Sequence, residues 1–180
     1  MLKHGLISEE GHWAELMTFD MDHPDYGKLQ QLVGESVQIK ERIVAQDPFE
    51  QGIRKALNLG HTIGHAFESF ALEREAPVLH GYAVAWGMVC ELYLAHQKTG
   101  FPTDKMRQTV QFIKENYGKL AFNCRDYDRL YEFMKHDKKN AAAGMINFTL
   151  LGGIGDIRIN QTATKEEINK ALDFYCETMG

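Results

Sequence analysis

The chain has 180 residues, a formal net charge of −5, 44% hydrophobic residues and 25% charged residues. These values are ordinary for one globular domain with a core of its own, and the acidic balance argues against a general affinity for nucleic acid or for an anionic membrane surface. Three widely spaced cysteines, Cys90, Cys124 and Cys176, favour reduced thiols in a cytoplasmic protein over a disulfide framework. No signal peptide is recognised, and the longest apolar stretch, 82–95, is too short to span a bilayer.

Helical periodicity dominates the sequence, and the expected fold class is mainly α, a multi-helix domain with one small β-hairpin. Ser8 is expected to cap the first helix, and Thr164 with Glu167 forms a capping box before the last. The run G-G-I-G at 152–155 lies between two strand-like stretches, which predicts a turn and not a phosphate-binding loop. In chain order, helices are expected over 8–19, 28–45, 47–72, 82–97, 103–116, 126–136 and from 164 onward, with the hairpin over 145–160 and His80 in a loop.

The segment 47–68, DPFEQGIRKALNLGHTIGHAFE, is the most informative part of the chain. Asp47 is a candidate N-cap, Pro48 suits the first helical position, and Glu50 completes a capping box. On one continuous helix, six polar residues fall within about 80° of one another: Glu50, Arg54, Asn58, His61, His65 and Glu68. Two histidines and an asparagine are unusual on a solvent face, so this stripe indicates the wall of a site.

Gly60 and Gly64 stand four residues apart in the same segment. Each glycine costs about 1 kcal/mol of helix propensity relative to alanine. Their presence predicts that another backbone or a ligand comes close to this helix.

Three histidines within twenty residues suggest a metal site. His61 and His65 are spaced i, i+4, so both imidazoles can reach one point, and His80 supplies a third ring. The metalloprotease pattern needs glutamate where Thr62 stands, which makes that interpretation weak. Spacing alone leaves metal binding and coincidence both open.

Basic residues form a possible anion-binding cluster in spite of the acidic total. Arginine binds a carboxylate or phosphate in bidentate fashion, and lysine serves as a point charge. Alone, the run K-H-D-K-K-N is more typical of a solvated charge run. The candidates are Lys40, Arg54, Lys55, Lys138 and Lys139.

Three ordered motifs give the chain a resemblance to a known family. They are K-x13-R-K-A-L-N-L-G-H-T-I-G-H-A-F-E, then L-H-G-Y-A-V-A-W-G-M, then H-D-K-K-N before a glycine and a short strand. Together they resemble 3-dehydroquinate synthase, a zinc- and NAD-dependent cyclase of the shikimate pathway of aromatic amino acid biosynthesis. The likeness covers residues 1–180 but only the family's C-terminal, mainly helical domain, so the N-terminal NAD-binding domain is expected to be absent from this chain.

The resemblance implies a role for each matching residue. His61 and His80 become ligands of zinc, or of cobalt, and the third ligand, a glutamate, is expected just before Met1. His65 becomes a catalytic residue for proton transfer and phosphate contact, and Glu50 an acid–base residue. The positions that match substrate contacts are Lys3, Lys40, Arg54, Lys55, Ala56, Leu57, Asn58, His80, and one of Lys138 and Lys139.

The implied reaction is that of a carbon–oxygen lyase. It converts 3-deoxy-D-arabino-heptulosonate 7-phosphate to 3-dehydroquinate and phosphate, with NAD oxidising and then reducing the substrate. The implied partners are this anionic sugar phosphate, the N-terminal domain and a possible second copy in a homodimer, with no nucleic acid and no membrane. The chain alone is expected to be inactive and to bind zinc weakly, since two imidazoles leave a tetrahedral ion short of ligands.

Other interpretations stay open from the sequence. Cyclases of the 2-deoxy-scyllo-inosose synthase type use a substrate without the carboxylate, and Arg54, Lys40 and the D-K-K run speak against that choice. Iron-dependent alcohol dehydrogenases also carry a histidine-rich helix but do not explain L-N-L-G-H or D-K-K. A non-catalytic fragment is the alternative from outside the enzymes.

Overall fold

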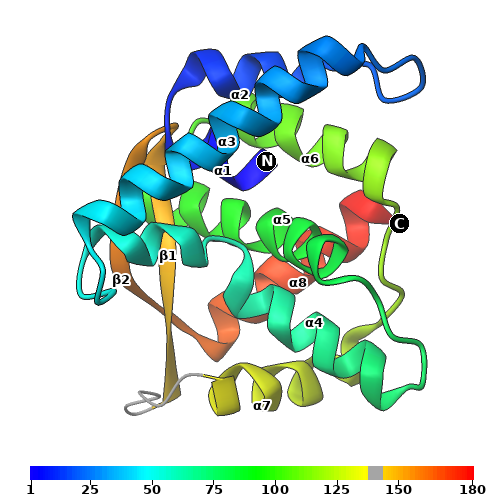
Figure 1. Cartoon of the computed structure of the whole chain (residues 1–180). Helices are drawn as coiled ribbons and strands as arrows, with labels where there is room; N and C mark the ends of the chain where they lie inside the picture. The colour runs from blue at the N-terminus through cyan, green and yellow to red at the C-terminus, as the bar shows by residue number, and fades with distance from the viewer. Residues whose placement is uncertain (138–143) are drawn as a thin grey trace.

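A computed structural model describes residues 1–137 and 144–180. It confirms a mainly helical fold with one antiparallel hairpin (Figure 1). In chain order the elements are α1 (Leu2–Ile7), α2 (Glu10–Met17), α3 (Tyr26–Gln46), the 3₁₀ helix η1 (Ile53–Asn58), α4 (His61–Glu73), α5 (His80–Thr99), α6 (Thr103–Tyr117), the 3₁₀ helix η2 (Cys124–Asp126), α7 (Tyr127–Asp137), β1 (Met145–Gly153), β2 (Asp156–Thr164) and α8 (Lys165–Met179).

The core is built around α5, which lies in the middle of the molecule (Figure 1). Every residue from Ala83 to Leu92 is buried, because α4, α6, α8 and β1 all pack against this helix. A helix that is apolar around most of its circumference is expected to be enclosed in this way. The central place predicted for the 82–97 helix is therefore confirmed, although the helix begins two residues earlier, at His80.

The β-hairpin covers one side of this core. Its strands are antiparallel, with Met145 opposite Thr164, and the side chains of Ile146, Phe148 and Leu150 are buried. At its tip, Gly155 has φ +76° and donates its N–H to the carbonyl of Leu6 in α1 at 2.9 Å. The predicted glycine turn is thus confirmed, and it also joins the hairpin to the start of the chain.

Capping signals near the two ends of the chain have opposite outcomes. The predicted capping box before α8 is confirmed, because Thr164 Oγ1 accepts the N–H of Glu167 and Glu167 Oε2 accepts that of Thr164. The short helix predicted over 8–19 is confirmed as α2 (Glu10–Met17), but the predicted Ser8 cap is wrong. Ser8 instead lies between α1 and α2, and Glu9 is the residue that precedes α2.

The single helix predicted over 47–72 is also wrong. The carboxylate of Asp47 accepts backbone N–H groups from Gln51, Gly52 and Arg54, which closes a loop and not a first helical turn. The capping box predicted for Glu50 is absent, since this residue has φ +55°. A 3₁₀ turn follows, and the α-helix begins only at residue 61, after a glycine at φ +80°.

A close crossing of α4 and α5 explains that glycine and its neighbours. A Cβ atom on Gly87 would overlap the carbonyl of Gly60 and the backbone of Gly64, and a Cβ atom on Gly64 would lie 3.0 Å from the carbonyl of Ala83. The close backbone approach predicted for Gly60 and Gly64 is therefore confirmed. It places the first turns of the two helices side by side.

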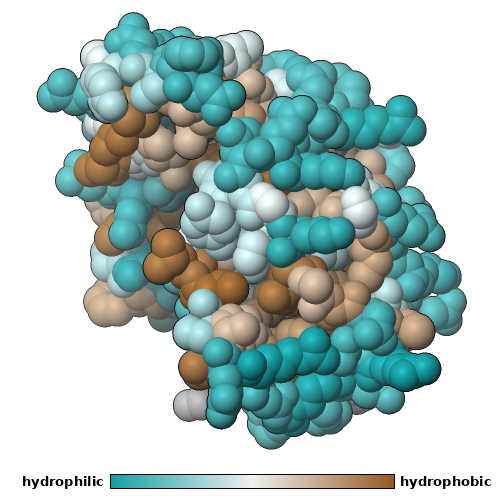
Figure 2. Space-filling model, turned by 90° about the vertical axis from the view of Figure 1, so that its right-hand side faces the viewer, coloured by the Kyte–Doolittle hydropathy of each residue, from teal (hydrophilic) through white to brown (hydrophobic). Residues whose placement is uncertain are grey.

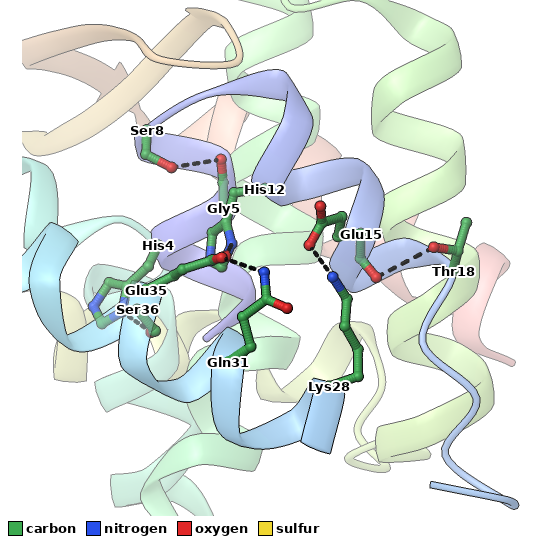
Figure 3. Close-up of polar contacts among 10 residues, drawn as sticks. All are labelled: His4, Gly5, Ser8, His12, Glu15, Thr18, Lys28, Gln31, Glu35 and Ser36. Atoms are coloured by element: carbon green, nitrogen blue, oxygen red, sulfur yellow. Dashed lines mark hydrogen bonds and ion pairs between the residues drawn. The ribbon is translucent and has the colours of Figure 1, made fainter. Parts of the chain in front are cut away.

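Polar contacts join α1 and α2 to α3 on the other side of the fold (Figure 3). His4 Nδ1 lies 2.5 Å from the hydroxyl of Ser36, and His12 Nδ1 lies 2.8 Å from Glu35 Oε2. His12 and Ser36 are both 5% exposed, so these contacts sit inside the junction of the three helices. The first contact fixes α1 against α3, and the second fixes α2 against α3.

The surface combines charged edges with exposed apolar side chains. On the face shown in Figure 2, hydrophilic residues line the upper and lower edges and apolar residues gather between them. Phe49, Leu79, Tyr26 and Leu72 are each more than half exposed. Among the described residues, no helix combines the length and the apolar character needed to cross a bilayer.

Candidate metal and substrate site

An open cavity of about 550 Å³ lies where α1, α3, the 50–58 segment and the first turns of α4 and α5 meet. In spite of the break in the predicted helix, four residues of the polar stripe still line this cavity: Glu50, Arg54, Asn58 and His61. His65 and Glu68 are not among its lining residues, although the ring of His65 lies 5.3 Å from that of His61. The cavity is lined by Met1, Leu2, Lys3, His4, Lys40, Glu50, Arg54, Leu57, Asn58, His61, His80, Gly81, Val84, Ala85, Met88 and Tyr117.

Three imidazoles converge at this cavity. His61 is the first residue of α4, His65 lies one turn further, and His80 is the first residue of α5. The ring centroids are 5.3 Å apart for His61–His65 and for His61–His80, and 5.6 Å apart for His65–His80. Each ring offers a nitrogen within 4.8 Å of those of the other two, which is close enough for one metal ion to be held among them.

Hydrogen bonds orient two of these rings. His61 Nδ1 lies 3.1 Å from the carbonyl oxygen of Leu59, and His80 Nδ1 lies 3.1 Å from Glu68 Oε2. Both oxygens can only accept, so each Nδ1 donates its N–H, and the Nε2 atom of a neutral ring is left to bind a metal ion. Metal-binding histidines typically donate their second N–H to a carbonyl or a carboxylate in this manner. The donor set therefore fits a zinc or cobalt ion.

The surroundings keep His61 in its neutral form. Burial, assisted by the charge of Lys3, lowers the pKa of His61 from 6.5 to about 4. A neutral imidazole is the form that binds a metal ion. At neutral pH this ring is thus available as a ligand without first losing a proton.

Three cationic side chains line the same cavity: Lys3, Lys40 and Arg54. Lys3 Nζ donates to the carbonyl of Leu57 at 2.7 Å, and Arg54 Nη1 donates to the carbonyl of Pro48 at 2.7 Å. Burial, and secondly the charge of Lys40, lowers the pKa of Lys3 from 10.5 to about 8. Cations brought together in this way favour an anionic ligand.

Glu50 is the acidic side chain among the residues that line the cavity. Asn58 Nδ2 donates to Glu50 Oε1 at 2.8 Å, which holds the carboxylate in place. No helix begins at this position, so Glu50 is not a helix N-terminal carboxylate. It is a group that can exchange a proton with a molecule bound in the cavity.

Some residues expected at the site lie elsewhere. Lys55 is not on the cavity wall and its Nζ lies 3.2 Å from Asn160 Oδ1, while Ala56 is completely buried in the core. Lys138 and Lys139 are outside the described residues. Leu57 does reach the cavity and supplies the carbonyl that holds Lys3.

Sequence reasoning missed two residues beside the site. His4 lines the cavity, and nothing in its spacing singled it out. Glu91 is completely buried in α5 and binds the backbone at the start of α4. Its signal was a lone carboxylate within an apolar stretch, a position where burial needs hydrogen-bond partners.

Comparisons with known proteins place the chain in one family. The profile of the family described as 3-dehydroquinate synthase C-terminal matches residues 1–140. A 3-dehydroquinate synthase of Parabacteroides distasonis is 59% identical over 180 residues, which is 100% of this chain and 51% of that protein. One of Leptospira interrogans is 38% identical over 167 residues, which is 89% of this chain and 45% of that protein. The chain thus spans about half the length of these relatives.

Solved structures share the fold at low sequence identity. A 2-deoxy-scyllo-inosose synthase complexed with carbaglucose-6-phosphate, NAD⁺ and Co²⁺ matches with a TM-score of 0.75 and 20% identity, over 95% of this chain and 48% of that one. A 2-epi-5-epi-valiolone synthase from Streptomyces hygroscopicus, with NAD⁺ and Zn²⁺ bound, matches with a TM-score of 0.73 and 20% identity, over 98% of this chain and 49% of that one. On the family match over residues 1–140 and these relatives, the chain belongs to the 3-dehydroquinate synthase C-terminal family.

Proposed function

We propose that this chain is the metal- and substrate-binding half of a 3-dehydroquinate synthase, which converts 3-deoxy-D-arabino-heptulosonate 7-phosphate to 3-dehydroquinate and phosphate. The observation that carries the proposal is the convergence of three imidazoles on a cavity lined by Lys3, Lys40 and Arg54. The imidazoles suit a metal ion, and the cations suit a substrate that bears both a carboxylate and a phosphate.

His61 and His80 are the proposed metal ligands, through Nε2 of each ring. Zinc or cobalt supplies Lewis acidity toward the substrate oxygens when it is bound. Leu59 and Glu68 hold the two rings by their Nδ1 protons. The remaining protein ligand is proposed to come from the half of the relatives that this chain does not span.

Arg54 and Lys40 are the proposed carboxylate-binding residues, with Lys3 as a further substrate contact. His65 is proposed to contact the phosphate and to transfer a proton, because its ring lies within 5.6 Å of the ring of His80. Glu50, held by Asn58, is the proposed acid–base group. The chain's own contribution is thus orientation, charge neutralisation and proton transfer.

NAD is the proposed cofactor of the complete protein. Two structural neighbours are described with NAD⁺ and with Co²⁺ or Zn²⁺ bound. The chain covers about half of each neighbour, so we assign NAD binding to the other half. On this proposal the chain alone is inactive, and release of phosphate by it with added NAD⁺ and zinc would contradict that assignment.

A cyclase of the 2-deoxy-scyllo-inosose synthase type is the second candidate. The structural neighbours favour it only at the level of the fold, since they are 20% identical. Arg54 separates the two candidates, because a guanidinium on the cavity wall suits a carboxylated substrate. Arg54→Ala in a protein that carries both halves should lower kcat/KM toward the carboxylated substrate. The expected decrease corresponds to a loss of about 2–5 kcal/mol of transition-state stabilisation. An unchanged kcat/KM would favour the second candidate.

Metal binding by the chain tests the site directly. Cobalt titration, followed by visible absorption, should give binding that is lost in His61→Ala and in His80→Ala. His96→Ala is the matched control, since His96 is a half-buried histidine away from the cluster that pairs with the carbonyl of Phe101. Equal cobalt binding by all four chains would contradict the assignment of His61 and His80 as ligands.

A further inference from the structure

Glu91 is a carboxylate with 0% exposure in the middle of α5, the helix at the centre of the core. Its Oε2 accepts the backbone N–H of Gly60 at 2.6 Å, and its Oε1 accepts the backbone N–H of Ile63 at 3.1 Å. A charge buried among apolar groups is costly unless it is hydrogen-bonded. These two bonds therefore help to offset the cost of burying the carboxylate in this place.

The carboxylate replaces a cap that α4 cannot supply for itself. An N-cap serine, threonine or aspartate normally accepts the free N–H groups of a first turn. The N-cap position of α4 is Gly60, where a Cβ atom would lie 2.8 Å from the carbonyl of Val84 and would also press on Met88. The crossing with α5 thus excludes a side chain there. A carboxylate from α5 both accepts the free N–H groups and faces the positive end of the helix dipole.

The two bonded N–H groups stand on either side of His61 along the chain. Gly60 precedes this residue, and Ile63 follows it by two positions. The ring of His61 is held in turn by the carbonyl of Leu59 at 3.1 Å. Movement of this turn would therefore carry the ring away from the point that it shares with the rings of His65 and His80.

We propose that Glu91 is a positioning residue for the histidine cluster, acting on His61 through the backbone of the first turn of α4. Glu91 touches neither the metal nor the substrate in this proposal. The prediction for metal affinity rests on the proposed function, whereas the prediction for the position of the ring does not.

Glu91→Gln is the variant that tests the proposal. It keeps the size of the side chain, but its carboxamide oxygen can accept fully from one N–H group while its NH₂ group faces the other. Amide exchange at Gly60 or Ile63 should accelerate about tenfold or more. The NMR contacts between the rings of His61 and His80 should weaken, and the affinity for cobalt should fall about 10- to 100-fold.

Glu35→Gln is the matched control. It removes a carboxylate that pairs with the buried His12 at the junction of α1, α2 and α3. This variant should keep the ring contacts of His61 and the cobalt affinity of the unchanged chain, even if its melting temperature falls.

The outcomes separate the two proposals. Unchanged ring contacts and unchanged exchange in Glu91→Gln, with only a lower melting temperature, would overturn the positioning role. If a protein that carries both halves binds no cobalt, the proposed function is contradicted, and the ring contacts still decide the role of Glu91. If Glu91→Gln does not fold, Glu91→Asp keeps the charge but withdraws it by one methylene group, and is assessed by the same measurements.

Discussion

Two regions of this molecule bring histidines together with polar partners, and they differ in how the rings are partnered. At the α4–α5 crossing, three rings face one another at 5.3–5.6 Å. At the α1–α2–α3 junction, His4 pairs with Ser36 and His12 pairs with Glu35, each ring with its own partner (Figure 3). The comparison shows that convergence of ring nitrogens, and not burial near an acid, distinguishes a candidate ligand cluster from structural histidines.

The backbone differs between the two regions as well. The crossing is closed by Gly60, Gly64 and Gly87, which leave no room for a methyl group. Gly34, on the α3 side of the junction, has no atom within 4 Å of its Cβ position. Substitutions should therefore affect the two regions very differently.

Gly87→Ala should give the largest loss of stability. The added methyl group would overlap backbone atoms of α4, which cannot move as a flexible side chain would. We expect a loss of about 3 kcal/mol or more in the free energy of unfolding. Gly34→Ala should instead be neutral or stabilising, since alanine is the better helix former by about 1 kcal/mol. Urea denaturation of both variants measures the difference, and equal stabilities would contradict the close crossing.

His61→Ala and His12→Ala should separate the two kinds of histidine. His61→Ala should lower cobalt affinity about 100-fold or more, because one ligand is lost, with little loss of stability. His12→Ala should leave the affinity unchanged and cost about 1–3 kcal/mol of stability, since it leaves a cavity and removes one hydrogen-bond partner of Glu35. Calorimetric titration and thermal unfolding test the pair. Loss of cobalt binding in His12→Ala would mean that the junction histidine belongs to the site.

Both regions should share one sensitivity to acid. Burial lowers the pKa of His4 from 6.5 to about 4, and that of His61 likewise. Between these values the unfolded chain binds more protons than the folded chain, so stability should fall as the pH is lowered from 6.5 toward 4. Without metal present, we expect His4→Gln to reduce the total loss of stability between pH 6.5 and pH 4 by about 1 kcal/mol after solvent screening. Chemical denaturation at a series of pH values measures the slope, and an identical slope in the variant would refute this origin.

Lys28→Ala should have the smallest effect. The ammonium group of Lys28 lies 2.5 Å from Glu15 Oε2, and both side chains are partly exposed. Exposed ion pairs contribute about 0–1 kcal/mol. Thermal unfolding at low and at high salt measures the contribution. A larger loss would show that this pair, and not the histidine contacts, holds α2 against α3.

The sequence supports the helical class, the hairpin and the residues of the cavity, but not the path of the chain between 47 and 61. Apolar periodicity continues through that stretch, so one helix is the natural prediction. The break at Gly60 depends on the crossing with α5, a contact between distant segments that periodicity cannot reveal. Tertiary packing thus decides where α4 begins.

The 3₁₀ conformation of η1 also explains why neighbouring residues of one motif lie on different faces of this turn. A 3₁₀ helix has about three residues per turn, so positions i and i+3 share a face. Arg54 and Leu57 accordingly both line the cavity. Lys55 turns toward Asn160 and Ala56 enters the core, although a family motif places all four residues together.

The bond between Gly155 and Leu6 bears on the order in which the cavity can be completed. Lys3 and His4 lie on α1, the short helix that carries Leu6. Gly155, the other residue of the bond, lies at the tip of the hairpin. During synthesis on the ribosome the N-terminal helix emerges long before the hairpin exists. Contacts of such high sequence separation form late and slowly in folding. The cavity wall that bears Lys3 and His4 is therefore expected to become fixed only after most of the chain has been translated.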